Sequence, residues 1–145
     1  MKYISRSIDK TLEEWKESTT HKPLLLRGAR QVGKSSAVRH LGTQFKYFAE
    51  VNFESAKSIA TFFKGDLDVK LISSKISNYI QVPIIPGQTL LFLDEIQACP
   101  EAIMALRFFK EDYPELHVIA AGSLLEFALQ SLPTFGVGRI HSVFM

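Results

Sequence analysis

Three short runs along the chain are apolar at almost every position, over residues 24–26, 89–95 and 117–122. A strand with one exposed face alternates apolar with polar residues, so runs without alternation indicate strands that are buried on both faces. Glycine, proline or charged residues lie at the ends of each run, as is typical of strand boundaries. The three runs therefore predict the central strands of a parallel sheet.

Two further segments alternate apolar with polar residues, as strands with one buried face do. They cover residues 45–54 and 139–145. The first of them places five side chains on one face: Phe45, Tyr47, Ala49, Val51 and Phe53.

The segments before and between the predicted strands indicate helices, and residues 4–18 and 67–80 show the apolar spacing of an amphipathic helix. We expect helices over residues 4–18, 34–41, 56–64, 67–80, 100–111 and 123–130. Pro100 stands at the first position of the fifth helix, where proline is favoured. Gly42 is placed to end the second helix as a C-terminal stop.

Helices and strands thus alternate along the chain. This order predicts an α/β fold, a three-layer sandwich in which helices cover both faces of a mainly parallel five-stranded sheet. A length of 145 residues favours one domain, over residues 1–145. The contents of 46% hydrophobic and 22% charged residues are ordinary for a globular protein.

The net charge of +2 gives no argument for binding nucleic acid or a membrane surface. Cys99 is the one cysteine, so no disulfide can form within the chain, which suits a reducing compartment. No apolar run approaches the ~18 residues that span a membrane, and the N-terminus lacks a signal-peptide pattern. We therefore expect a soluble cytoplasmic protein.

The first apolar run leads into GARQVGKS, residues 28–35, which fits the phosphate-loop pattern G-x-x-x-x-G-K-[ST]. Glycines let the backbone turn sharply and approach a ligand closely. Successive N–H groups and the start of the following helix then form a site for phosphate. The expected nucleotide-binding residues are Gly28, Ala29, Arg30, Gln31, Val32, Gly33, Lys34, Ser35 and Ser36.

A lysine, a serine and two acids in these segments have specific predicted roles. Lys34 can reach the β- and γ-phosphates, and the Ser35 hydroxyl can ligate Mg²⁺. Asp94 ends a predicted buried strand, where ligands bind in open parallel sheets, and can also hold Mg²⁺. Glu95 is the candidate general base for an attacking water. A strand that merely ends in solvated acids is the alternative, which the upstream phosphate loop disfavours.

Two polar residues farther along have less specific roles. Ser123 follows the third apolar run and could sense the γ-phosphate or orient water, although a helix N-cap explains it equally well. Arg139 could stabilise transition-state charge, but a solvated arginine at a strand end is the simpler interpretation. The four histidines, His21, His40, His117 and His141, show no spacing typical of a metal site.

These motifs lie in four stretches, LLLRGARQVGKSS, TLLFLDEIQACPE, HVIAAGSLLEFAL and VGRIHSVFM, which resemble P-loop ATPases of the AAA type. The chain is similar in particular to a prokaryotic family that joins an AAA domain to a DUF4143 domain. The resemblance implies ATP and Mg²⁺ as ligands, and a sheet with the order fifth, first, fourth, third and second strand. It also implies a phosphate role for Lys34, metal roles for Ser35 and Asp94, a base role for Glu95 and a sensor role for Ser123.

Members of that family continue into a helical lid and the DUF4143 domain. The resemblance therefore implies that residues 1–145 correspond to the nucleotide-binding core alone. The final predicted strand would then be a candidate edge for self-association.

The predicted function is Mg²⁺-dependent ATP hydrolysis, with ATP and ADP as ligands. A switch that binds nucleotide without turnover, and a P-loop phosphotransferase, stay open on the sequence alone. The adjacent Asp94 and Glu95 favour activation of water over phosphotransfer. The sequence does not define a nucleic-acid or protein client.

Overall fold

A computed structural model describes residues 7–28, 33–123, 125 and 140–144. The strands in this part are β1 (Leu24–Arg27), β2 (Tyr47–Asn52), β3 (Thr89–Asp94), β4 (His117–Gly122) and β5 (His141–Phe144). The helices are α1 (Ser7–Glu17), α2 (Lys34–Gly42), α3 (Lys57–Ala60), α4 (Val69–Ile80) and α5 (Pro100–Asp112). Two 3₁₀ turns, η1 (Thr61–Phe63) and η2 (Ile96–Ala98), complete the elements.

The strands form one parallel sheet in the order β2-β3-β4-β1-β5. This order confirms the predicted one, read from the opposite edge. Strand β4 lies between β1, which leads into the glycine-rich loop, and β3, which ends in the acidic pair. Strands β1 and β3, which lead to the candidate site residues, are therefore separated by β4. Side chains that follow β1 must reach across the end of β4 to contact those at the end of β3.

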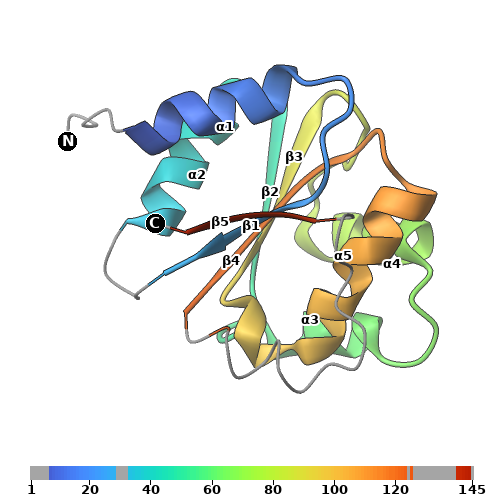
Figure 1. The fold of residues 1–145 in the computed structure, drawn as a ribbon. Coiled ribbons are helices and arrows are strands. Elements are labelled where there is room, and N and C mark those ends of the chain that lie inside the picture. Colours follow the sequence, from blue (N-terminus) through green and yellow to red (C-terminus); the bar gives the residue numbers. More distant parts are fainter. Residues whose placement is uncertain (1–6, 29–32, 124, 126–139, 145) are drawn as a thin grey trace.

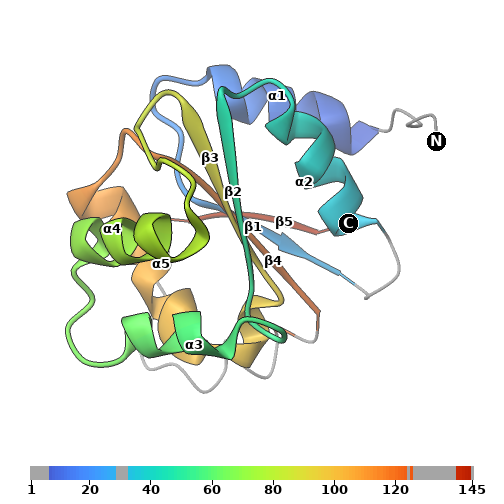
Figure 2. The ribbon, with the colours of Figure 1, turned by 180° about the vertical axis from the view of Figure 1, so that it is seen from behind.

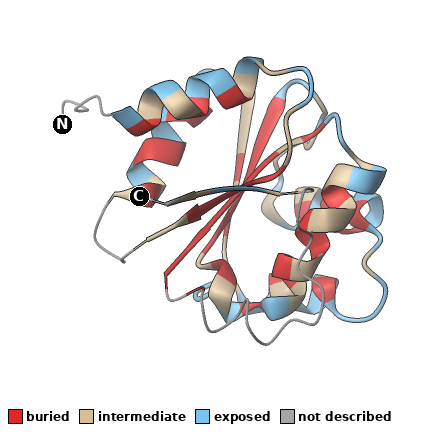
Figure 3. Cartoon of the chain, in the orientation of Figure 1, coloured by how far each residue is buried: buried red, intermediate tan, exposed pale blue. Residues whose placement is uncertain are grey.

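Helices cover both faces of the sheet, and Figures 1 and 2 show α1 and α2 on one side and α3, α4 and α5 on the other. The central strands β1, β3 and β4 send alternate apolar side chains into two separate cores. Along β3, for example, Leu91 and Leu93 pack with α4 and α5, whereas Leu90 and Phe92 pack with α1 and α2. Figure 3 shows the resulting buried centre. Burial on both faces is why these strands read as continuous apolar runs.

The predicted helix and strand ends differ from the observed ends at several places. The strand predicted over residues 45–54 is shorter, and the helix predicted over residues 56–64 divides into α3 and η1. The predicted end of α2 at Gly42 is confirmed, although Gly42 is the last residue of the helix and Thr43, in a right-handed conformation, is its C-cap. A Cβ atom at residue 42 would lie 2.6 Å from Cδ1 of Phe48, so Gly42 serves the close contact between α2 and β2.

Besides residues 29–32 of the glycine-rich loop, two predicted features lie outside the described residues. They are Arg139 and, except for Ser123 and Leu125, the helix expected over residues 123–130. In the part of the chain that the structure describes, no helix is both long enough and apolar enough to cross a membrane.

Candidate functional site

The carboxyl ends of the parallel strands meet at one edge of the sheet. Gly28 follows β1 there, Asp94 ends β3, and Ser123 follows β4. Helix α2 begins at Lys34, after the loop that leaves β1. The fold therefore gathers the predicted phosphate, metal and sensor residues at the edge where open parallel sheets bind ligands.

The two glycines of the loop adopt conformations that side chains disfavour. Gly28 has φ 149° and Gly33 has φ 78°, which explains the use of glycine at both ends of the turn. Gly33 forms the N-cap of α2, and its carbonyl oxygen accepts a 3.1 Å hydrogen bond from the Ala37 N–H. The four residues between them, Ala29, Arg30, Gln31 and Val32, lie outside the described residues.

Lys34 is buried at this edge, with 5% of its surface exposed. Its Nζ donates a 3.0 Å hydrogen bond to the carbonyl oxygen of Gly28, at the other end of the loop. A buried ammonium group needs such partners, because transferring a charge out of water is costly. The Lys34 ammonium group therefore joins the start of α2 to the end of β1, on either side of the predicted phosphate loop.

Ser35 and Asp94 meet across the end of the intervening strand β4. The Ser35 Oγ donates a 2.7 Å hydrogen bond to Asp94 Oδ2, and the backbone N–H of Glu95 donates a 2.8 Å hydrogen bond to Asp94 Oδ1. Asp94 is 4% exposed, so both carboxylate oxygens are satisfied in a buried position. The predicted metal pair is therefore assembled, with one hydroxyl and one carboxylate side by side.

Glu95 has a left-handed backbone, with φ 53° and ψ 45°. A residue with a Cβ atom disfavours this conformation, and such strain clusters at functional sites. Glu95 joins β3 to η2, and its side chain is partly exposed beside Asp94. This is the placement expected of a group that must contact both substrate and water.

Ser123 is 6% exposed and lies directly after β4, between the ends of β1 and β3 in the sheet order. This position suits the predicted sensor, but it does not distinguish that role from a helix N-cap. Ser36, the third residue of α2, is exposed.

An ion pair that the sequence does not indicate flanks the site. Arg39 on α2 donates two hydrogen bonds to the Glu50 carboxylate on β2, at 2.9 and 2.7 Å. The hydrogen bond to Glu50 raises the pKa of Arg39, and the charge of Asp94 raises it further. The two residues lie on different elements, so no local pattern in the sequence could have indicated the pair.

A second missed residue is Gln97, whose Nε2 lies 3.4 Å from Glu95 Oε2. The only signal for it in the sequence is its position two residues after the acidic pair, in LDEIQ.

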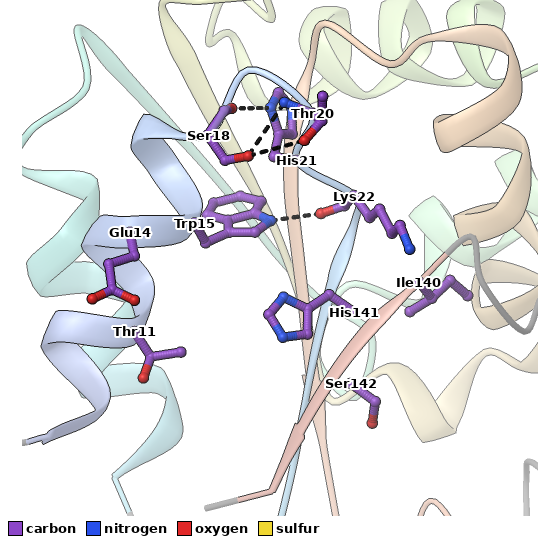
Figure 4. A pocket seen from close by; sticks show the side chains of 10 residues that line it. All are labelled: Thr11, Glu14, Trp15, Ser18, Thr20, His21, Lys22, Ile140, His141 and Ser142. Atoms are coloured by element: carbon purple, nitrogen blue, oxygen red, sulfur yellow. Dashed lines mark hydrogen bonds between the residues drawn. The ribbon is translucent and has the colours of Figure 1, made fainter.

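One hollow in the described part of the chain lies away from these residues. It has a volume of about 480 Å³ and lies between the end of α1 and the start of β5 (Figure 4). Trp15, Lys22 and His141 line it, and the Trp15 Nε1–H donates a 2.6 Å hydrogen bond to the Lys22 carbonyl oxygen. Since β1 and β5 begin there, this hollow lies at the amino ends of the strands, whereas Asp94 lies at their carboxyl ends.

The comparison with protein families agrees with the geometry of the site. The sequence model of a family described as AAA domain matches residues 20–145, which include the loop, Asp94, Glu95 and Ser123. A search of curated proteins finds no match. The family match concerns the AAA domain, and a following DUF4143 domain stays a prediction.

Proposed function

This chain belongs to the AAA domain family, whose members are P-loop proteins that bind nucleotides, and we propose that it binds ATP with Mg²⁺ and hydrolyses it. The observation that carries this proposal is the 2.7 Å hydrogen bond between Ser35 Oγ and Asp94 Oδ2. It joins the start of the helix after the phosphate loop to the acidic end of β3. A loop that bound only a simple anion would not need this second group of oxygen atoms.

The loop and Lys34 are the proposed phosphate-binding groups. The Lys34 ammonium group, now bonded to the Gly28 carbonyl oxygen, can exchange that acceptor for oxygen atoms of the β- and γ-phosphates. The N–H groups at the start of α2 add partial positive charge in the same direction. Each of these donors stabilises charge that increases on the phosphates during the reaction.

The donors at the proposed metal site fit Mg²⁺, which prefers oxygen ligands and is usually held by one or two protein groups together with phosphates. Ser35 would contribute its hydroxyl oxygen and Asp94 its carboxylate. Bound Mg²⁺ supplies positive charge beside the transferring phosphate.

Glu95 is the proposed base. Its carboxylate accepts a proton from water while the water oxygen forms a bond to the γ-phosphorus. The bond between that phosphorus and the β,γ-bridging oxygen breaks, and ADP leaves with the electron pair. The products are ADP, phosphate and one proton, which Glu95 returns to solvent. Positioning and charge stabilisation supply most of the acceleration in such reactions.

Phosphate release and ATP affinity test the proposal together. Glu95→Gln should retain ATP affinity and lose phosphate release by a factor of about 100 or more. Lys34→Ala should lose both, because it removes a buried cation from the phosphate site. The matched controls are Glu115→Gln and Lys75→Ala, two exposed positions far from the loop in sequence, which should behave as the parent chain.

Two other results would change the proposed function or the proposed role of Glu95. Tight ATP binding that depends on Lys34, without phosphate release by the parent chain, would favour a nucleotide switch. Glu95→Gln turning over ATP as fast as the parent would exclude Glu95 as the base.

A further inference from the structure

Gln97 lies between the proposed base and the end of the neighbouring strand β4. We propose that Gln97 is a positioning residue, whose side-chain amide holds the Glu95 carboxylate in place and is itself held by contact with Gly122. The inference rests on the proposed ATP hydrolysis for its effect on rate. The contacts that carry it do not depend on that function.

The 3₁₀ turn η2 brings Gln97 back onto Glu95. Two backbone hydrogen bonds form this turn, from the Ala98 N–H to the Glu95 oxygen at 3.1 Å and from the Cys99 N–H to the Ile96 oxygen at 2.9 Å. Gln97 Nε2 then donates a long hydrogen bond of 3.4 Å to Glu95 Oε2. Catalytic hydrogen bonds are often long before substrate binds and shorten in the complex.

The opposite end of the amide packs on the backbone of β4. A Cβ atom built at Gly122 would lie 2.4 Å from Gln97 Oε1, which is far closer than real atoms approach. Residue 122 must therefore lack a side chain if Gln97 is to keep this position. Gln97 Oε1 is buried, and within the described residues it accepts no hydrogen bond.

The contact with Glu95 sets the direction of the amide. Turning it over would place Oε1 against the carboxylate of Glu95, where two acceptor oxygens repel each other. The NH₂ group must consequently face Glu95. Glutamate has several staggered rotamers in general, and the amide favours those that keep Oε2 of Glu95 at Gln97.

A fixed carboxylate matters for the chemistry because the base must meet a water aligned with the γ-phosphate. Supporting residues of this kind typically change activity by about 10- to 100-fold when removed. A residue that merely fills space would instead lower stability and leave kcat intact in the molecules that stay folded.

The rate experiment uses the whole chain and three variants. Gln97→Met keeps the length of the side chain and removes the donor, and should lower kcat about 10- to 100-fold with KM and ATP affinity within about twofold of the parent. Gln97→Glu replaces the donor with a repelling carboxylate and should lower kcat at least as much. Gly122→Ala should lower kcat through Gln97, so its effect should shrink when Gln97 is already Met.

Unchanged kcat in Gln97→Met, or equal losses of kcat and ATP affinity, would overturn the proposal. Thermal unfolding of each variant separates loss of fold from loss of rate. If the parent chain itself releases no phosphate, the proposed hydrolysis fails instead, and a second measurement decides the role of Gln97. Its side-chain NH₂ signal, assigned in ¹⁵N NMR from its absence in Gln97→Met, should shift in Glu95→Ala. If the chemical shift of the Gln97 NH₂ group is the same in Glu95→Ala as in the parent, the proposal is overturned, whether or not the chain hydrolyses ATP.

Discussion

Ser35 Oγ lies 2.7 Å from Asp94 Oδ2, and this hydrogen bond connects α2 to the end of β3 across the end of β4. The two residues are 59 positions apart in the sequence. Their contact depends on the crossover that places β1 and β3 on either side of β4. The same two oxygen atoms are the proposed metal ligands, so one interaction serves both the fold and the site.

Ser35→Ala should therefore affect nucleotide binding and stability separately. In the presence of Mg²⁺ the ATP affinity should fall about tenfold or more, which corresponds to about 1.4 kcal/mol. With EDTA present, parent and variant should bind ATP equally, because the hydroxyl is proposed to act through the metal. Unfolding in urea should show a loss of about 1–3 kcal/mol, since the buried Asp94 carboxylate loses a donor.

Two variants control the Ser35 experiment. Ser35→Thr keeps a hydroxyl and should retain the Mg²⁺ dependence, and Ser74→Ala removes an exposed hydroxyl from α4 and should change neither property. Equal losses of ATP affinity with Mg²⁺ and with EDTA would contradict the metal role.

The strained turn at Glu95 predicts a gain in stability when the base is replaced. Asparagine tolerates the left-handed conformation that Glu95 adopts at φ 53° better than other residues with a Cβ atom. Glu95→Asn should raise the free energy of unfolding in urea by about 1 kcal/mol while abolishing phosphate release. Glu95→Gln retains the strain and should lose activity without this gain. Equal stability of the two variants would show that the turn stores no such strain.

Much of the fold follows from local sequence. Leu24, Leu25 and Leu26 form a strand because both sides of β1 are covered, and this removes the alternation that a half-exposed strand shows. The loop glycines and the acidic pair are likewise placed by short motifs with a known physical basis. These features depend on neighbours within a few residues, so they can be predicted from the sequence of one chain.

The features that sequence did not predict depend on contacts between distant segments. Gly42 ends a helix as its sequence position indicates, but its close contact with the ring of Phe48 on β2 is set by the tertiary structure. The stack of His21 on His117, at 3.8 Å between ring centroids, joins residues 96 positions apart. Gln97 gains a role only because Gly122 lies against it. Tertiary packing sets all three, and no local pattern encodes it.

The contact between Gly42 and Phe48 predicts that the effect of Gly42→Ala on the free energy of unfolding has opposite signs with and without the Phe48 ring. Alanine is favoured over glycine inside a helix by about 1 kcal/mol, but here its Cβ atom would lie 2.6 Å from Cδ1 of Phe48. Gly42→Ala should therefore destabilise the parent by about 1–3 kcal/mol, measured by urea unfolding. In a Phe48→Ala background the ring is gone, and the same substitution should stabilise. If Gly42→Ala destabilises the parent and the Phe48→Ala variant equally, the Phe48 ring is not the cause of the loss.

Cys99 should react slowly with thiol reagents in the folded chain. It is 1% exposed, and burial raises its pKa, so little thiolate is present and little of it can be reached. Labelling with a disulfide reagent at pH 8 should be slow in buffer and become fast when urea unfolds the chain. Cys99→Ser should remove the signal under both conditions. Fast labelling of the folded protein would show that the start of α5 opens readily.

His117 should make the fold sensitive to acid. Burial, reinforced by the adjacent His21, lowers the pKa of His117 to about 4 from its ordinary value of 6.5. Its Nε2 donates to the Lys16 carbonyl oxygen at 3.1 Å, and Nδ1 is buried without a hydrogen-bond partner in the described residues. A proton added at Nδ1 would therefore find no acceptor there.

The sign of the effect follows from which state binds the proton. Between pH 6.5 and about 4 the unfolded chain protonates His117 and the folded chain does not, so the free energy of unfolding falls as the pH is lowered through this window. Above pH 6.5 the contribution is complete. His117→Phe keeps a stacking ring that cannot titrate, and should flatten this part of the curve in urea unfolding at a series of pH values. His141→Gln, which removes an exposed histidine, should leave the slope as in the parent. A slope that His117→Phe does not reduce would place the acid sensitivity on other groups, with His21 the first to replace because its ring stacks on His117.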